Sequence, residues 1–142
     1  MSGSQDLREF VRAEPAPRDA TVLVRGGPDS VEKLAEHAER LSRRYVLDGD
    51  PVLGISVFAA LDDLGPASLD GILSGKLATY RMMHVVALNL LVAAGFTVLP
   101  TFSRPHMTVT LRTLDWVERL LAAFGPLQNN PHYGEMVRRR RG

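Results

Sequence analysis

Apolar and polar residues alternate strictly along residues 106–111. One side carries only apolar residues and the other only polar ones: Met107, Val109 and Leu111 against His106, Thr108 and Thr110. Successive side chains of a β-strand point to opposite faces of a sheet, so this alternation predicts a strand with a core face and a polar surface face. No other segment of the chain has so regular a pattern.

Runs of β-branched and apolar residues predict further strands elsewhere in the chain. They cover residues 21–24, 52–60, 79–86 and 96–99. Gly26-Gly27-Pro28 ends the first of them, and Asp48-Gly49-Asp50-Pro51 is a strong turn signal ahead of the second. The short lengths are typical of strands in a central sheet.

Apolar residues recur at helical spacing between these runs. The clearest helix follows Asp29-Ser30, which we interpret as a capping box, and its apolar stripe runs from Val31 to Tyr45. Further helices are predicted at about residues 4–13, 69–77 and 88–94, and one after Thr113. Ser4, Ser68 and Thr113 are their expected caps, and Gly95 ends the third.

Helices and strands therefore alternate along a chain of 142 residues, which is the usual length of one domain. We predict an α+β fold with a mixed central sheet of about five short strands and flanking helices. Residues 1–20 are expected to form an N-terminal helix and linker, residues 21–126 the globular domain, and residues 127–142 a polar loop with a basic tail.

Composition excludes several kinds of site and points to the cytoplasm. Cysteine is absent, which excludes disulfides, thiolate zinc sites and cysteine nucleophiles. The chain has no secretory signal and no run of about 18 apolar residues, so we expect no contact with a membrane. The spacing of the four histidines matches no metal-ligand pattern, and His37 is expected on a charged helix face.

Charge is distributed unevenly. Residues 1–137 carry 13 basic and 16 acidic groups, which leaves about −3, and the tail from Arg138 to Arg141 adds +4. A basic surface spread over the domain is therefore not indicated. The tail alone would be suited to steering RNA or binding an acidic partner.

Two histidines on predicted strands are the best candidates for a chemical site. His106 shares a strand face with Thr108, and His84 shares one with Tyr80 in the strand at 79–86. Imidazole is neutral or charged near pH 7 and serves as acid or base. If the two rings face each other, they can cleave RNA without a metal.

Arginines near these histidines would offset charge on the reacting phosphate. Arg104 precedes the strand of His106, and Arg25 follows the first predicted strand. Arg81 alternates to the opposite face from His84, so it would have to reach around the sheet edge. We assign catalysis to His106, His84 and Thr108, and substrate binding to Arg104, Arg81, Arg25 and Tyr80.

Two short motifs resemble known enzyme families. His106-Met107-Thr108 resembles one half of the repeated His-x-Thr/Ser signature of 2H phosphoesterases, but Gly54 stands where the second histidine would be in Gly54-Ile55-Ser56. Arg25-Gly26, followed by the strand that carries Ser56, resembles the first two signatures of ADP-ribosyltransferases. That resemblance implies NAD binding around Arg25, Ser56 and Tyr80, although the family's catalytic glutamate has no counterpart.

The leading hypothesis is a small cytoplasmic, bacterial, metal-independent endoribonuclease of toxin type that uses histidine acid–base chemistry and no cofactor. Its expected partners are RNA and an antitoxin. Two alternatives stay open. One is a non-catalytic protein-interaction subunit whose histidines are structural, and the other is an NAD-using protein similar to ADP-ribosyltransferases.

Overall fold

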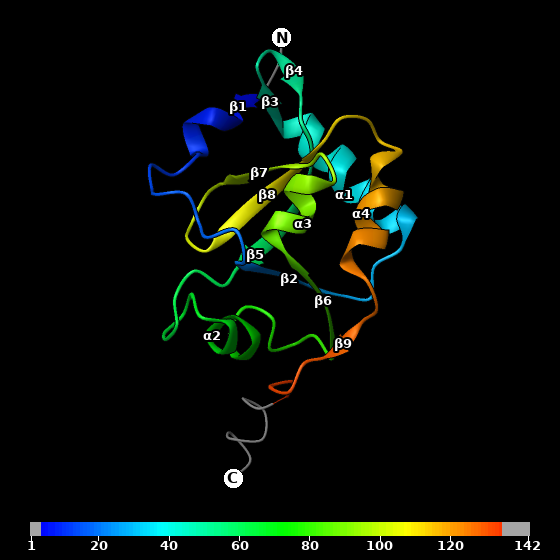
Figure 1. Ribbon diagram of the computed structural model, residues 1–142. Helices are drawn as coiled ribbons and strands as arrows, with labels where there is room; N and C mark the ends of the chain where they lie inside the picture. The colour runs from blue at the N-terminus through cyan, green and yellow to red at the C-terminus, as the bar shows by residue number, and fades with distance from the viewer. Residues whose placement is uncertain (1–3, 135–142) are drawn as a thin grey trace.

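Six antiparallel strands form the main sheet in the computed structural model, which describes residues 4–134 (Figure 1). The strand order is β7-β8-β5-β2-β6-β9. The strands are β2 (Val22–Gly27), β5 (Leu53–Ala59), β6 (Met82–Ala87), β7 (Thr97–Pro100), β8 (His106–Leu111) and β9 (Gln128–Asn129). The α+β class is confirmed, but the sheet is antiparallel throughout and has one strand more than we predicted.

A second, three-stranded sheet lies beside the main one. It consists of β1 (Gln5–Asp6), β3 (Tyr45–Leu47) and β4 (Asp50–Pro51), and β1 pairs with β3 in parallel. The turn between β3 and β4 has positive φ angles at Asp48 and Gly49, 52° and 87°. Aspartate and glycine tolerate that conformation, as a two-residue hairpin requires, so the predicted turn is confirmed.

Helices cover both faces of the main sheet. They are α1 (Val31–Arg44), α2 (Leu69–Ser74), α3 (Leu88–Ala93) and α4 (Trp116–Phe124). Leu34, Leu91 and Leu120 of α1, α3 and α4 pack with Leu23, Ile55 and Val109 of the sheet in the main core. Ile72 and Leu73 of α2 pack with Val24 and Met83, which point to the opposite face. Figure 1 shows α2 apart from the other three helices.

Helix α1 follows from its local sequence. Ser30 is its N-cap and accepts a hydrogen bond from the amide of Lys33 at 3.1 Å. The predicted apolar stripe is confirmed, because Leu34 and Ala38 are fully buried. Asp29 takes no part in capping and instead binds Arg25 at 2.6 Å.

Several predicted elements differ from the structure. Residues 4–13 do not form a helix, because the chain pairs through β1 and then makes one 3-10 turn, η1 (Leu7–Phe10). Thr113 is not the N-cap of α4, which begins after Asp115. The strand predicted at 79–86 begins only at Met82. Residues 128–129 add edge strand β9, so this part of the predicted polar loop belongs to the sheet.

The main sheet is open at its centre. Strands β2 and β5 pair at only two positions, Leu23 with Ala59 and Val24 with Phe58. Beyond them β2 continues beside β6, while β5 continues beside β8. The first half of β5 thus has an unpaired edge in the middle of the sheet, where backbone groups need other partners.

Glycine at position 54 permits close packing next to this open edge. A Cβ atom there would lie 2.6 Å from the side chain of Leu41 in α1 and 2.7 Å from that of Thr108. A side chain at this position would require Leu41 and Thr108 to shift, so glycine suits it.

Among residues 4–134, no helix is both long and apolar enough to cross a membrane. The four arginines of the basic tail lie outside the residues that the structure describes.

Candidate functional site

His84 and His106 do not face each other. His84 lies on β6 and His106 on β8, and strands β2 and β5 separate them. Three spacings of about 4.8 Å put the two strands roughly 14 Å apart. The register also sends the rings to opposite faces: His84 is paired with Arg25, on the side of the main core, and His106 with Phe58, on the side of α2. The predicted concerted acid–base pair is therefore wrong.

His84 is part of the core. Its ring is 3% exposed and lies 5.0 Å from the ring of Phe124. Its Nε2 accepts a hydrogen bond from the amide of Asp29 at 3.0 Å, so the proton is on Nδ1, which is buried without a partner. Burial lowers the pKa of His84, although the carboxylate of Asp29 opposes this effect. A neutral, enclosed ring of this kind cannot reach a substrate.

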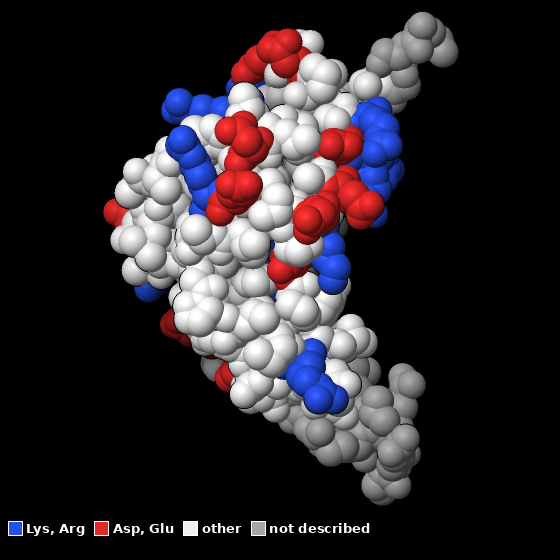
Figure 2. Space-filling view, turned by 90° about the vertical axis from the view of Figure 1, so that its right-hand side faces the viewer, with Lys and Arg blue, Asp and Glu red and all other residues white. Residues whose placement is uncertain are grey.

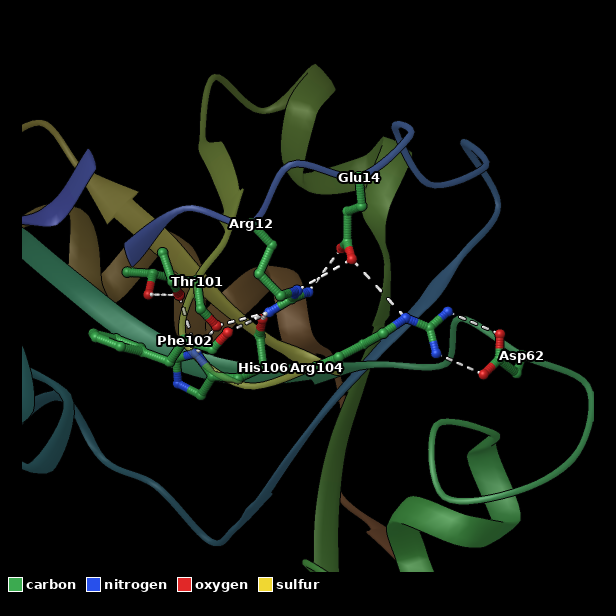
Figure 3. A network of polar contacts seen from close by, with 8 residues as sticks. Arg12, Glu14, Asp62, Thr101, Phe102, Arg104 and His106 are labelled. Carbon is green, nitrogen blue, oxygen red and sulfur yellow. Dashed lines mark hydrogen bonds and ion pairs between the residues drawn. The ribbon is translucent and has the colours of Figure 1, made fainter. Parts of the chain in front are cut away.

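His106 is half-buried and its ring is held from one side. Thr101 offers it two acceptors, since Nδ1 lies 3.0 Å from the threonine hydroxyl and 3.2 Å from the threonine carbonyl. The Thr101 hydroxyl lies a further 2.6 Å from that of Thr108 (Figure 3). A carbonyl oxygen only accepts, so this arrangement favours the proton on Nδ1 and a lone pair on Nε2.

The Nε2 atom of His106 is the reactive end of the ring. It makes no hydrogen bond within residues 4–134 and is not among the buried polar atoms that lack a partner, so it reaches solvent. Burial lowers the pKa of His106, and the positive charges of Arg12 and Lys76 lower it further. The ring is therefore neutral at pH 7 and available as a proton acceptor.

Thr108 supports this ring and does not contact ligand. It is fully buried, which contradicts the polar surface that the alternation predicted. Thr101, which arrives from the end of β7, covers this part of β8 and satisfies the hydroxyl of Thr108. The predicted contact between Thr108 and phosphate is therefore wrong.

Arg12 and Glu14 hold together the chain segments next to His106. The guanidinium of Arg12 donates to the carbonyls of Thr101 and His106 at 2.8 and 2.7 Å, and it forms a two-pronged ion pair with Glu14 (Figure 3). That pair lowers the pKa of Glu14. Neither residue was predicted, because their partners lie about ninety positions away in the chain.

Arg104 lies at the outer end of the same network. Its guanidinium forms a two-pronged ion pair with Asp62 at 2.7 and 2.8 Å, and its Nε lies 3.9 Å from Glu14 (Figure 3). Hydrogen bonding to Arg104 lowers the pKa of Asp62. Two carboxylates already compensate this cation, so the structure does not support its predicted role in holding phosphate.

The other predicted binding residues lie on the far side of the sheet opening. Arg25 binds Asp29 and donates to the carbonyl of Ser56 at 2.8 Å. The ring of Tyr80 lies against Gly26, and Arg81 stacks over the ring of Tyr133 at 5.2 Å. Arg25 lies on β2, and Tyr80 and Arg81 directly precede β6, so none of the three is on the strand of His106.

His37 is a further residue of this region that the sequence did not predict. It projects from α1 into the opening of the sheet, where its Nε2 lies 3.3 Å from both the amide and the hydroxyl of Ser56. Arg25 and His37 thus satisfy the two backbone groups that Ser56 exposes at the open edge. His37 is half-buried, contrary to the charged face we expected. Its spacing from Leu34 and Leu41, three and four residues, was the available signal.

Burial and the nearby positive charges of Arg25 and Arg40 lower the pKa of His37 to about 4. Since Nε2 already accepts the amide proton of Ser56, and so low a pKa makes the ring a weak base, we assign His37 a structural role at the strand edge. His37 and Ser56 resemble a catalytic serine–histidine pair only in the distance between Nε2 and the hydroxyl oxygen.

A pocket of about 380 Å³ opens between α1 and the start of β5, and we call it the α1 pocket. It is lined by His37, Arg40, Leu41, Arg44, Tyr45, Ser56 and Phe102. No carboxylate lines it, and neither arginine forms an ion pair within residues 4–134. The ring of Phe102 also touches His106, at 5.3 Å between centroids. The pocket is therefore suited to an anion close to His106.

A larger groove of about 810 Å³ has the opposite character. Its charged lining residues are Glu14, Asp62, Asp63 and Asp70 against Arg18 and Arg104. A phosphate would be repelled there. Figure 2 shows that positive and negative side chains also lie next to one another on the face it presents, so that face has no large patch of one sign.

The described part of the chain, residues 4–134, contains no group of three or more histidine, aspartate or glutamate side chains placed to hold a metal ion. His106 lies close enough to His37 to lower its pKa, but no third histidine or carboxylate of the described residues joins the two in a metal site. No protein-family model matches the chain, and no curated protein or solved structure is significantly similar to it.

Proposed function

We propose that this protein cleaves RNA at the junction of His106 and the α1 pocket. One observation carries the proposal. The neutral, oriented ring of His106 presents its Nε2 to solvent near the α1 pocket, where Arg40 and Arg44 form no ion pair within residues 4–134. Acid–base groups near neutral pH and cations around a phosphate are the two requirements of this reaction. His106 keeps its predicted role, and His84 loses it.

The reaction is written for one histidine. Nε2 of His106 takes the proton of the 2′-hydroxyl, and the 2′-oxygen attacks phosphorus. The bond to the 5′-oxygen breaks, and water protonates that leaving oxygen. The products are a 2′,3′-cyclic phosphate and a free 5′-hydroxyl, and His106 returns its proton to solvent. Arg40 and Arg44 stabilise the additional negative charge on the phosphorane.

A short RNA incubated with the purified protein in EDTA tests the proposal. We expect products that end in a 2′,3′-cyclic phosphate, identified by mass, and no cleavage at a nucleotide that lacks the 2′-hydroxyl. His106→Gln should lose activity by about 100-fold or more, the usual range for a general base. His132→Gln is the matched control, because this histidine pairs with Asp70 elsewhere on the surface. Equal cleavage by His106→Gln would overturn the proposal, as would an inactive parent protein.

A second candidate function has one observation in its favour. Arg25 and Ser56, the residues that resemble ADP-ribosyltransferase signatures, are in direct contact at 2.8 Å. For an NAD-using protein we expect NAD to raise the thermal midpoint of unfolding. The contact is made by the carbonyl of Ser56, and Asp29 occupies the same guanidinium, so we rank this function second.

The toxin role and an antitoxin partner stay predictions from the sequence, because no described surface tests them. A non-catalytic subunit is the outcome that remains if neither RNA nor NAD is used.

A further inference from the structure

We propose that four rings, of which His106 is one, form a binding track for single-stranded RNA. The aromatic row, as we call it, runs Phe58–His106–Phe102–Tyr45, with centroid separations of 5.8, 5.3 and 5.4 Å. The inference deepens the proposed function and rests on it, since it names the form of RNA that this site takes.

The row is a surface feature built by the fold. Phe58 and His106 are paired across β5 and β8, so both side chains point to the same face of the sheet. Phe102 is supplied by the loop before β8, and Tyr45 by the start of β3, directly after α1. All except Tyr45 are partly exposed. The three contacts are tilted or edge-on, with interplanar angles of 81°, 67° and 59°, and none is a parallel stack.

A cation lies at each end of the row. The Lys76 ammonium lies 5.5 Å from the centre of the Phe58 ring, and the Arg44 guanidinium 6.0 Å from that of Tyr45. Arg40 adds a third cation in the α1 pocket. The positive charge of Lys76 lowers the pKa of His106, so its field reaches the middle of the row. Alternating rings and cations are the arrangement that binds the bases and phosphates of a single strand.

The backbone at Phe102 supports a binding role. Its φ angle is 58°, in the left-handed region that bulky residues rarely adopt. The amide of Phe102 donates to the carbonyl of Phe10 at 2.8 Å, and Arg12 binds the flanking carbonyl of Thr101, so the surrounding chain enforces this conformation. The result is a ring held between His106 and the α1 pocket.

Single-stranded RNA fits this track better than a duplex. In a duplex the bases are already stacked on one another, and only phosphates and sugar edges remain for the protein. Phe58 and Phe102 are partly exposed, and only bases that are unstacked from their neighbours can stack on such rings. A base against Phe58 or Phe102 would place the neighbouring phosphate and 2′-hydroxyl near Nε2 of His106.

Fluorescence anisotropy with a labelled single-stranded 2′-O-methyl oligoribonucleotide of about ten nucleotides tests the track, because 2′-O-methylation blocks cleavage. We expect Phe58→Leu and Phe102→Leu each to weaken binding on the order of ten-fold, since base stacking on one aromatic ring commonly has that effect. Phe102→Tyr should bind like the parent. The duplex of the same sequence should bind more weakly than the single strand.

Trp116→Leu is the matched control. Trp116 lies between Arg112 and Arg119, at 5.1 and 4.4 Å, and thus offers a ring with cations outside the row. Its substitution should leave binding unchanged. Far-ultraviolet circular dichroism checks the fold of each variant. If Phe102→Leu does not fold, Phe58→Leu carries the test, because Phe58 lies on strand β5 and not in the loop that holds Phe102 at its positive φ angle.

Three results would overturn the track: no binding by the parent, unchanged binding in the folded leucine variants, or equal binding of the duplex. The two proposals fail separately. Binding without cleavage would remove the nuclease and keep the track. Cleavage of RNA with unchanged affinity in Phe58→Leu and Phe102→Leu would remove the track and keep the nuclease.

Discussion

His84 and His106 occupy similar positions in the sequence, each in a β-strand among apolar residues, but their surroundings are opposite. His84 is enclosed by Phe124 and Asp29, with one nitrogen buried and unpartnered. His106 is held at Nδ1 by Thr101, and its Nε2 reaches solvent near the α1 pocket. The comparison teaches that a histidine in a strand is suited to acid–base chemistry only where one ring nitrogen is held by a hydrogen bond and the other is accessible to solvent.

Replacing each histidine by alanine should separate the two environments most clearly. We expect His84→Ala to lower the free energy of unfolding by about 3 kcal/mol, because it leaves a cavity and an unpaired amide at Asp29. His106→Ala should cost less than about 1 kcal/mol, since its ring is partly exposed. Urea denaturation measures both. Similar losses in the two variants would contradict the distinction.

The pH dependence of the free energy of unfolding should reveal the lowered pKa of a third histidine, His37. Its pKa is near 6.5 in the unfolded chain and about 4 in the folded protein, so between these values the unfolded state binds more protons. Stability therefore falls as the pH is lowered from 6.5 to 4, by roughly 2 to 3 kcal/mol from this residue. The lowered pKa values of His84 and His106 act in the same direction.

His37→Gln isolates that contribution. The glutamine amide oxygen can still accept the amide proton of Ser56 but does not titrate. Urea denaturation at a series of pH values should show a shallower decline in the variant than in the parent. An identical pH profile would mean that His37 is not held neutral at the strand edge.

The hydroxyl chain behind His106 should have a smaller effect on stability. Thr108→Val removes the buried hydrogen bond to Thr101 and keeps the shape of the side chain, which should cost about 1 kcal/mol. Thr110→Val is the matched control on the same strand face, where a partly exposed hydroxyl bonds the carbonyl of Thr97. Equal thermal midpoints for the two variants would argue against a supporting role for Thr108.

Arg104→Gln should have the smallest effect. Its ion pair with Asp62 is exposed, and such pairs contribute little and are screened by salt. We expect RNA cleavage at the parent rate and a stability difference below that of Thr108→Val, which disappears in 1 M salt. A large loss of cleavage would restore the phosphate-binding role that the sequence suggested for Arg104.

Local sequence determined most of the secondary structure. Alternation predicted β8, the apolar stripe predicted α1, Asp48-Gly49-Asp50-Pro51 predicted a turn, and Gly95 predicted the end of a helix; the structure contains all four. These features depend on residues a few positions apart, so they can be read without knowing the fold. The N-terminal helix was wrong because pairing of Gln5 with Tyr45 in the small sheet outweighed local helix propensity.

Only the tertiary structure decided the site. Periodicity tells which residues share a face of a strand, but not which strand lies beside it or what covers it. Strand order therefore separated His84 from His106, a loop distant in sequence buried Thr108, and the opening between β2 and β5 brought His37 to Ser56. Each of these outcomes depends on contacts between segments far apart in the chain, which no local pattern encodes.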